Sequence, residues 1–229
     1  MVAEQDPSVD RRAAVYRALS DEMRLVMLDA LWAGDRTPGQ LQALTGLRSN
    51  LVAFHLDVLE GAGLISRHAS QGDKRRRYVT LQPTAIPHVG TVVPLRVDCV
   101  AFVCTHNAAR SQLAAAVWRE RTGRSAVSGG TRPARQVHPQ AVAVAAAHGL
   151  DLSGERPRHI ADIDVVPDLL ITVCDRANET ALPLAVPRRH WSISDPVGGN
   201  DRSFARAYQT IAQRVERLAF ETATSSHHR

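Results

Sequence analysis

The sequence of 229 residues is poor in cysteine and in aromatic residues. Its three cysteines are too few for the disulfide framework that stabilises small secreted domains. Aromatic residues make up 4% of the chain, which leaves few platforms on which bases or aryl groups could stack. The chain also lacks an apolar stretch of roughly 18 residues and an N-terminal secretion signal. We therefore expect a cytoplasmic protein with no membrane partner.

The distribution of residues along the chain indicates two domains. The length allows two separate cores, and all three cysteines lie beyond residue 98. Lys and Arg outnumber Asp and Glu by only 28 to 23, so the placement of the positive charges matters more than their sum. The patterns predict a helical first domain over residues 1–82, a Pro-containing linker over 83–94 and a strand-and-helix domain over 95–229.

The most informative segment runs from Cys104 to Ser111, where a nucleophile and a guanidinium enclose five residues. It follows the apolar run Val97–Val103, an expected strand, and precedes an Ala-rich helix expected over Gln112–Arg121. If the loop wraps around an oxyanion, that anion is bound by the loop amides, the guanidinium of Arg110 and the positive end of the helix. The same positive groups favour the thiolate form of Cys104. The alternative is a structural cysteine beside an Arg that merely caps or pairs. The expected oxyanion-binding residues are Thr105, His106, Asn107, Ala108, Ala109 and Arg110. Asn107 stands mid-loop, where a left-handed conformation is tolerable.

The rest of the second domain alternates strands with helices, which favours a parallel sheet covered on both faces. The loop then lies at the carboxyl end of the first strand, where open parallel sheets place ligands. The further strands are expected at Ser125–Ser128, Asp168–Cys174 and Arg189–Ile193, and the further helices at Pro139–His148 and Ser203–Thr222.

The first domain is expected to hold four helices and a hairpin. The helices are predicted at Arg11–Leu19, Asp21–Trp32 with Ser20 as its cap, Gly39–Leu44 after Thr37-Pro38, and from Arg48 or Ser49 to Gly61. Val52, Leu56 and Leu59 face inward on the fourth helix. Two strands, Leu64–His68 and Tyr78–Leu81, enclose a turn at Gly72-Asp73.

The tip of this hairpin carries four consecutive cations, which alone would indicate only a solvated turn. Beside a helix-turn-helix they indicate a wing that contacts nucleic acid. The runs Arg17–Leu25 and His55–Ile65 resemble the ArsR-type winged-helix repressors over most of residues 11–82. The resemblance implies a partner, operator DNA, whose major groove receives the fourth helix. The implied DNA-binding residues are Arg48, Ser49, Asn50, Ala53, Phe54, His55, Lys74, Arg75, Arg76 and Arg77.

Within that set, Asn50 is suited to an adenine edge, and the Arg residues to phosphates. His55 is expected to be a packing or phosphate contact and not a metal ligand. This domain has no cysteine, so we do not expect it to sense arsenite through thiolates. A homodimer is expected through the first helix or the second domain.

The second domain resembles the low-molecular-weight tyrosine phosphatases and their arsenate reductase branch. The likeness rests on the Cys104 loop, Ser128–Thr131, Gly149–Ser153 and His190–Pro196. It implies that Cys104 is the nucleophile, that Arg110 clamps the oxyanion, and that Asn107 fixes the loop. It also implies that Ser111 hydrogen-bonds the thiolate and that Asp195 is the candidate acid. On its own, Asp195-Pro196 is equally compatible with a simple turn.

The substrate distinguishes the branches of this family. Related phosphatases carry tyrosines after the Asp-Pro pair, whereas Val197-Gly198-Gly199-Asn200 follows it here. A reductase needs further thiols, because reduction of arsenate takes two electrons from sulfur. Cys174 occupies the place of the second thiol in thioredoxin-linked members, unless it is a buried thiol without a redox role. Their third thiol would fall near Ala181 and is absent.

The reductant is therefore expected to be an external thiol of the mycothiol, glutathione or thioredoxin type, and no bound cofactor or metal is expected. The His106-Asn107 pair favours the small-thiol branch. Our first hypothesis is an arsenate reductase fused to a transcriptional regulator. The second is a DNA-binding regulator whose second domain is a non-catalytic oxyanion or arsenic sensor, and the third is a protein tyrosine phosphatase. The predicted fold is α/β, a winged helix-turn-helix domain followed by a low-molecular-weight phosphatase-like parallel-sheet domain.

Overall fold

The computed structural model describes residues 7–82, 96–199 and 201–223. The chain divides into two compact units, residues 1–70 with 74–91 and residues 71–73 with 92–229. The expected linker, residues 83–94, lies outside the described residues, as does Asn200. Within the described ranges, every helix is too short or too polar to cross a membrane.

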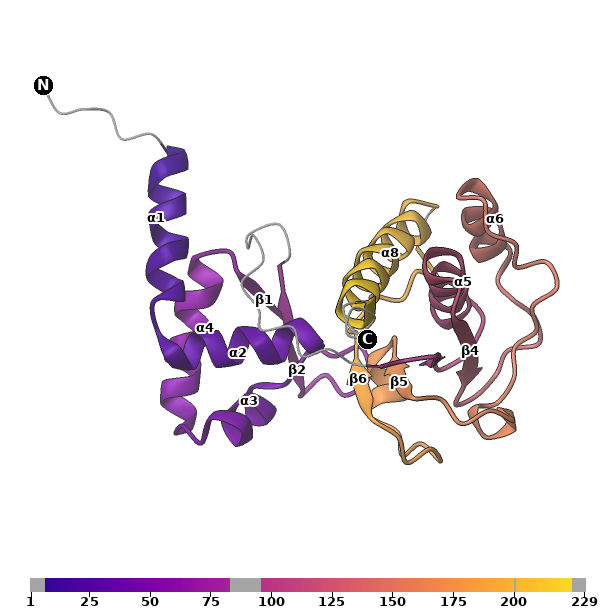
Figure 1. Cartoon of the computed structure of the whole chain (residues 1–229), viewed down its shortest axis with the longest axis horizontal. Coiled ribbons are helices and arrows are strands. Elements are labelled where there is room, and N and C mark those ends of the chain that lie inside the picture. Colours follow the sequence, from indigo (N-terminus) through magenta and orange to yellow (C-terminus); the bar gives the residue numbers. More distant parts are fainter. Residues whose placement is uncertain (1–6, 83–95, 200, 224–229) are drawn as a thin grey trace, which may run out of the picture. The chain divides into compact units, whose positions relative to one another are not determined.

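The first unit contains helices followed by a two-stranded hairpin, in the order expected from the sequence (Figure 1). Strands β1 and β2 pair antiparallel, with Ile65 opposite Leu81. The elements are α1 (Pro7–Leu19), α2 (Glu22–Ala33), α3 (Pro38–Thr45), α4 (Ser49–Gly61), β1 (Ile65–Ala69) and β2 (Arg77–Leu81).

The caps of α2 and α3 follow local side-chain chemistry, with one correction to the sequence analysis. Asp21, and not Ser20, caps α2, because its extended backbone lets the carboxylate accept from the amide of Arg24 at 3.0 Å. The Ser20 hydroxyl instead donates to the carbonyl of Arg17 at 2.8 Å, at the end of α1. Thr37 caps α3 as expected and forms a capping box with Gln40.

Helix α4 packs its predicted inner face into the core of the first unit. Val52, Leu56 and Leu59 are all buried, as the helical spacing predicts. They pack with buried apolar residues of α2, α3 and the hairpin in one cluster. This core holds the opposite face of α4 toward solvent.

The second unit is a four-stranded sheet with helices between the strands. Its strand order is β4-β3-β5-β6, and all neighbours are parallel, which confirms the predicted parallel sheet. The elements are β3 (Cys99–Cys104), α5 (Arg110–Thr122), β4 (Ser125–Gly130), α6 (Pro139–Ala147), the 3₁₀ helix η2 (Ile160–Asp162), β5 (Leu169–Thr172), α7 (Asp175–Asn178), β6 (Arg188–His190) and α8 (Asp201–Ala223).

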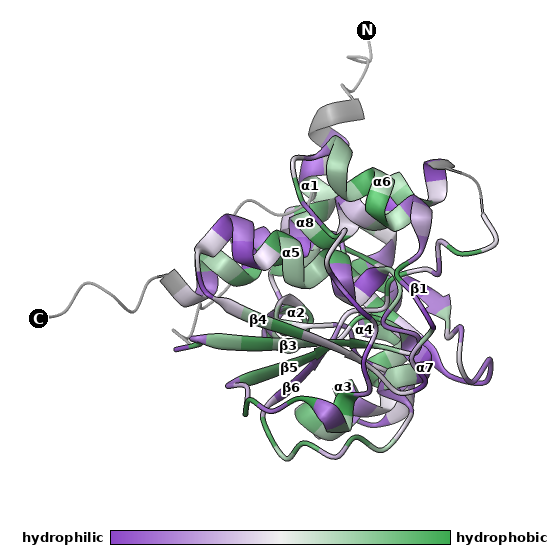
Figure 2. Cartoon of the chain, turned by 90° about the vertical axis from the view of Figure 1, so that its right-hand side faces the viewer, coloured by the Kyte–Doolittle hydropathy of each residue, from purple (hydrophilic) through white to green (hydrophobic). Residues whose placement is uncertain are grey.

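The central strands are buried on both faces. Every residue of β5, and every residue of β3 except Cys99, is buried, and successive side chains of a strand point to opposite faces. Figure 2 shows the hydrophobic central strands, with α5 and α8 beside them. The chain passes from β3 to β4 on one side of β3 and later to β5 on its other side. The carboxyl end of β3 is therefore the switch point at which such sheets bind ligands.

Candidate active site

The loop after β3 turns its carbonyl groups outward. Cys104, Thr105 and His106 each accept a backbone hydrogen bond from the segment that follows β4. The donors, in the same order, are the amides of Thr131 (3.2 Å), Arg132 (2.8 Å) and Ala134 (2.9 Å). Because the carbonyl and amide of a trans peptide point in opposite directions, the amides of residues 105, 106 and 107 face the concave side of the loop. These are amides through which the sequence analysis expects the loop to bind an oxyanion.

Gly130 allows the loop to lie against β4. A Cβ atom at this position would lie 2.8 Å from the carbonyl oxygen of Thr105 and 3.0 Å from the amide of Asn107. Both are backbone atoms, so neither can swing aside. The close approach therefore requires glycine.

Asn107 holds the loop from inside. Its φ of 48° is in the left-handed region that the sequence analysis allowed for it. The side-chain amide donates to the hydroxyls of Ser111 and Ser128, both at 2.9 Å. Its carbonyl oxygen accepts from the amide of Arg158 at 2.9 Å. This fully buried side chain thus connects the loop with α5, β4 and the segment before η2.

The sulfur of Cys104 is buried and has two polar neighbours. The amide of Asn107 donates to it at 3.2 Å, and the hydroxyl of Ser111 lies 3.1 Å away. Because the Ser111 oxygen already accepts from Asn107, its own proton is free to point at the sulfur. The expected nucleophile is therefore fixed at the base of the loop.

Arg110 and the beginning of α5 supply positive charge to the same place. The guanidinium is buried and donates to the carbonyl of Ile193 at 2.9 Å. It also forms an ion pair with Asp195 at 2.9 Å. Ala109 precedes α5 and gives its first turn no side-chain cap. The helix amides thus have no side-chain acceptor at this end, as an anion site requires.

Asp195 follows β6 and lies at the edge of the site. Its side chain is 38% exposed, and one carboxylate oxygen contacts Arg110 while the other accepts from the amide of Val197 at 3.2 Å. A carboxyl group in this position is within reach of an oxyanion that Arg110 holds. The structure thus brings the candidate acid to the loop from a distant part of the sequence.

Cys174 lies beside the loop, two residues after the end of β5, the strand that pairs with β3. Its sulfur is buried, accepts from the amide of Ala177 at 3.4 Å and lies 3.4 Å from the hydroxyl of Thr105. Burial raises the pKa of the Cys174 thiol, and the neighbouring Cys104 raises it further, while Arg110 lowers it. Two of the three cysteines therefore share one site.

The remaining loop residues differ in exposure. Thr105 and Ala109 are buried, Ala108 is half-buried, and His106 is exposed. Cys99 is half-buried at the far end of β3, where burial and then Asp168 raise the pKa of its thiol.

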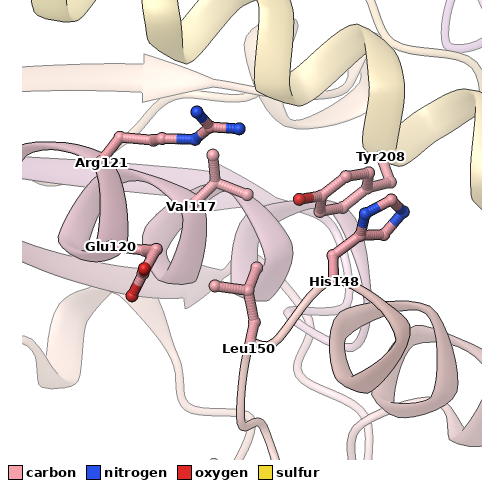
Figure 3. Close-up of a pocket in the computed structure, with 6 residues that line it drawn as sticks. All are labelled: Val117, Glu120, Arg121, His148, Leu150 and Tyr208. Atoms are coloured by element: carbon pink, nitrogen blue, oxygen red, sulfur yellow. The ribbon is translucent and has the colours of Figure 1, made fainter.

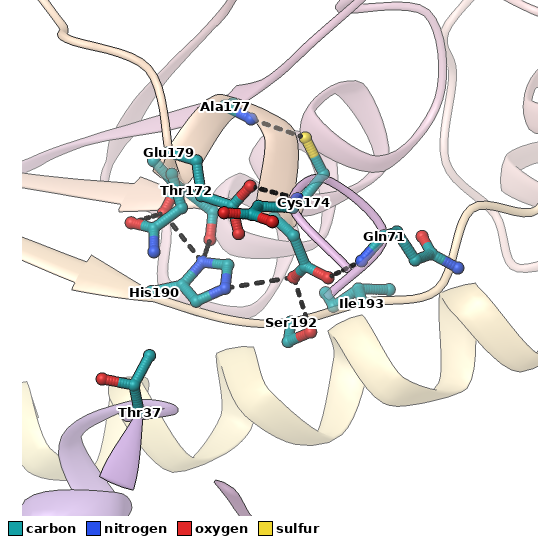
Figure 4. Close-up of polar contacts among 12 residues, drawn as sticks. Thr37, Gln71, Thr172, Cys174, Ala177, Glu179, His190, Ser192 and Ile193 are labelled. Carbon is teal, nitrogen blue, oxygen red and sulfur yellow. Dashed lines mark hydrogen bonds and ion pairs between the residues drawn. The ribbon is translucent and has the colours of Figure 1, made fainter. Parts of the chain in front are cut away.

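A second polar cluster next to Cys174 was missed by the sequence analysis. Asp175 is buried, its carboxylate accepts from Ser192 at 2.6 Å, and the ring of His190 lies 3.2 Å away (Figure 4). The available signal was an acid placed directly after the strand-end cysteine. Ser128 was noted only as part of a motif, although it binds the Asn107 amide.

In the first unit, the residues proposed for DNA binding separate into exposed and buried groups. His55 is only 9% exposed and its Nδ1 lies 3.7 Å from Asp21, so it belongs to the inner face of α4. It shares that face because it lies three residues after Val52. The burial of His55 agrees with the predicted packing role and contradicts the predicted phosphate contact. The exposed residues are Arg48, Ser49, Asn50, Ala53, Phe54, Lys74, Arg75, Arg76 and Arg77.

A separate pocket of about 160 Å³ lies among α5, α8 and the end of α6 (Figure 3). The His148 ring stacks on Tyr208 there, with 3.9 Å between ring centroids. Its lining contains no residue of the Cys104 loop: Val117, Glu120, Arg121, His148, Leu150 and Tyr208. Across the described ranges, His, Cys, Asp and Glu side chains form no group of three or more that could hold a metal ion.

About half of the chain is similar to known proteins. The chain is 32% identical over 126 residues to an arsenate reductase of Brevibacillus brevis, an alignment that covers 52% of this chain and 92% of that protein. It is 31% identical over 126 residues to arsenate reductase 1 of Bacillus cereus, with the same two shares covered. A solved arsenate reductase structure from Archaeoglobus fulgidus is 32% identical and has a TM-score of 0.49, covering 53% of this chain and 98% of its own. The family model for low molecular weight phosphotyrosine protein phosphatase matches residues 99–227, more than half of the chain. The chain therefore belongs to the low molecular weight phosphotyrosine protein phosphatase family.

Proposed function

We propose that the second unit is a thiol-dependent arsenate reductase whose nucleophile is Cys104. The observation that carries the proposal is the second buried thiol, Cys174, which contacts the oxyanion loop through Thr105. A phosphatase needs one nucleophilic sulfur, whereas a reductase must draw two electrons from a pair of thiols. The relatives named arsenate reductase support the same substrate.

In the first step, the Cys104 thiolate attacks the arsenic atom of an arsenate held by the loop amides and Arg110. A sulfur–arsenic bond forms, and one hydroxyl of arsenate leaves as water after it accepts a proton. Asp195, at 2.9 Å from Arg110, is the proposed donor of that proton. Arsenic remains in the pentavalent state at this stage.

In the second step, the Cys174 thiolate attacks the sulfur of Cys104. A disulfide forms, the sulfur–arsenic bond breaks, and its electron pair stays on arsenic, which leaves as arsenite. The two thiols have then lost two electrons to arsenic. An external thiol reductant returns the enzyme to its reduced state by thiol–disulfide exchange. In the alternative route, a small thiol attacks in place of Cys174.

The test is arsenate turnover by the purified full chain with a thiol donor and a coupled reductant. Wild type should form arsenite, and Cys104→Ser should not. Cys99→Ser is the matched control, because it makes the same change at a half-buried cysteine at the other end of β3. Absence of turnover with mycothiol, glutathione and thioredoxin systems would exclude the reductase.

An aryl phosphatase is the competing activity of the same loop. The residue after Asp195-Pro196 is Val197, which is 50% exposed and provides no aromatic wall. We therefore expect hydrolysis of p-nitrophenyl phosphate to be much slower than reduction of arsenate. Rapid hydrolysis that Asp195→Ala slows would favour the phosphatase instead.

We also propose that the first unit binds operator DNA and makes the chain a transcriptional regulator. The supporting observation is that α4 leaves Ser49, Asn50 and Ala53 exposed while its inner face holds the core. The hairpin adds four exposed cations, Lys74–Arg77. Polar side chains on an exposed helix suit base edges, and cations suit phosphates.

DNA binding is tested by selecting an operator from random duplexes and titrating it at several salt concentrations. Asn50→Ala should weaken the selected site by about 1–3 kcal/mol and relax its sequence preference. Arg75→Gln should weaken all duplexes alike and reduce the salt slope by about one unit. Arg121→Gln, at an exposed position of the second unit, serves as the charge-matched control. Salt-independent binding, or none, would contradict the proposal.

The sensor hypothesis is tested on the same preparation. If the second unit only senses oxyanions, operator affinity changes with arsenate, arsenite or phosphate while no arsenite forms. A ligand can shift DNA affinity only if it binds the DNA-bound and free states differently. Formation of arsenite without any change in operator affinity would support the enzyme hypothesis and exclude the sensor hypothesis.

A further inference from the structure

The imidazole of His190 contacts the chain on both sides of Cys174. Its Nδ1 lies 3.1 Å from the carbonyl oxygen of Thr172 and 2.9 Å from the hydroxyl of the same residue. Its Nε2 lies 3.2 Å from the carboxylate of Asp175. Thr172 is two residues before Cys174, and Asp175 is the residue after it. Figure 4 shows the ring beside this turn.

The contacts of the ring place polar partners at both of its nitrogens. The Thr172 hydroxyl donates to the side chain of Asn178 at 3.1 Å or the carbonyl of Arg189 at 3.3 Å, so its oxygen can accept from His190. Although burial opposes ionisation, hydrogen bonds from His190 and Ser192 hold the pKa of Asp175 below its usual value. His190 therefore links Thr172 to the buried carboxylate of Asp175.

The contact between His190 and Asp175 is placed where it controls the direction of the Cys174 side chain. Cys174 is the N-cap of α7 and Asp175 its first residue, so the orientation of this one-turn helix sets the orientation of the sulfur. A helix of four residues has little stability of its own. Its position must come from tertiary contacts, among them those of the buried Asp175 with His190 and Ser192.

We propose that His190 and Asp175 form a clamp that positions the Cys174 sulfur for disulfide formation with Cys104. The inference rests on the proposed role of Cys174 as the resolving thiol. His190 and Asp175 touch neither the oxyanion nor the reacting sulfurs, so they act as positioning residues. Without the clamp, Cys104 would still bind and attack arsenate, but the second step would slow.

The first test measures the clamp without arsenate. Diamide oxidises the two thiols to a disulfide, and mass spectrometry follows the loss of two hydrogens from the Cys104–Cys174 pair. Asp175→Asn should slow this reaction roughly 10- to 100-fold, because small displacements of reacting atoms cost rates of that order. Phosphate affinity, measured by calorimetry, should not change. Asp164→Asn is the matched control, since it makes the same change at an exposed carboxylate of the same unit.

Removing one partner of a buried polar contact leaves the other unsatisfied and can unfold the protein. His190→Gln therefore provides a second variant, which removes the imidazole and keeps an amide that can donate to Thr172. Asp175→Glu keeps the charge and should recover part of the oxidation rate. Equal loss of phosphate affinity and oxidation rate in folded variants would overturn the clamp, because it would indicate general damage to the site.

The second test uses arsenate turnover in the Cys174→Ser background. With dithiothreitol in place of the resolving thiol, Asp175→Asn should cause no additional loss, because the two changes act on one step. An additional loss would overturn the clamp. If wild type reduces no arsenate, the proposed function fails, while the diamide reaction still decides whether the clamp positions Cys174.

Discussion

Strands β3 and β5 pair with each other, and each leads through a cysteine to a helix, yet the two ends are built differently. Cys104 is the last residue of β3, and Cys174 lies two residues after the end of β5. After Cys104 a five-residue loop leads to Arg110 and the thirteen-residue α5. After Cys174 there is no loop, and Asp175 begins the four-residue α7 at once. The carboxyl end of β3 thus carries a loop of amides and the cation of Arg110, whereas the carboxyl end of β5 carries the buried carboxylate of Asp175.

This difference separates two tasks that one cysteine could not perform alone. In the proposed function, an oxyanion binds at the Cys104 end, where Arg110 and the uncapped amides of α5 lie. At the Cys174 end, the carboxylate of Asp175 is engaged by Ser192 and His190. Cys104 is thus suited to bind and attack, and Cys174 to exchange sulfur.

The largest effect is expected from Arg110→Ala, which removes the cation from the Cys104 end. Loss of one preorganised charge donor costs about 10²- to 10³-fold in rate, so kcat/KM for arsenate should fall by that order. Phosphate inhibition should weaken as well. The control is Arg119→Ala, which changes an Arg farther along α5. The guanidinium of Arg119 pairs with Glu155. An unchanged kcat/KM would show that the loop amides alone hold the anion.

Cys174→Ser should separate binding from resolution. Phosphate affinity should remain, whereas turnover with a protein reductant should fall roughly 10²-fold, because an external thiol lacks the effective concentration of a neighbouring one. Dithiothreitol should restore part of the rate. Steady-state kinetics with both reductants measure this. Full activity with every reductant would show that a small thiol, and not Cys174, completes the reaction.

The pH dependence of the second step should follow Cys174. Burial raises the pKa of its thiol, and only the thiolate attacks sulfur. With arsenate already bound, the single-turnover rate of disulfide formation should therefore rise about tenfold per pH unit until the raised pKa is reached. Stopped-flow quenching with mass analysis gives the rate. A flat profile through neutral and mildly alkaline pH would contradict an attack by a buried, protonated thiol.

The smallest effect is expected from Gly130→Ala, which tests the support of the Cys104 end. The added Cβ meets backbone atoms of Thr105 and Asn107, and such overpacking costs about 1–3 kcal/mol in the free energy of unfolding. Urea denaturation measures the loss, and calorimetry should show weaker phosphate binding. Gly154→Ala is the matched control, because its Cβ would meet no atom within 4 Å. Equal effects of the two changes would argue against the close packing of the loop.

Local sequence was sufficient for several of these features. The residues from Cys104 to Ser111 are contiguous, so strand, loop and helix could be read in order. Thr37 and Gln40 form their capping box within one turn. The spacing of Val52, Leu56 and Leu59 alone identified the inner face of α4. Each of these depends on interactions between residues that are near neighbours in the chain.

Other features required the folded chain. Ser20 and Asp21 are both good caps, and only the backbone conformation decided for Asp21. His55 was placed among DNA contacts, although it lies on the buried face of α4. The contact of His190 with Asp175 depends on the pairing of β5 with β6. Where two residues are equally suited to a cap or to a buried position, tertiary packing decides between them. A single sequence does not contain that information in a form that can be read directly.

The sequence by itself predicted the oxyanion loop, because the nucleophile, the run of amides and the guanidinium are contiguous in the chain and can surround one anion. It also determined the parallel-sheet class of the second unit, through the alternation of strands and helices. Only the tertiary structure decided that Cys174 lies beside Thr105, that Asp195 reaches Arg110, and that Asn107 is held by Ser128. The physical reason is strand order: the sheet β4-β3-β5-β6 brings these distant segments to one edge.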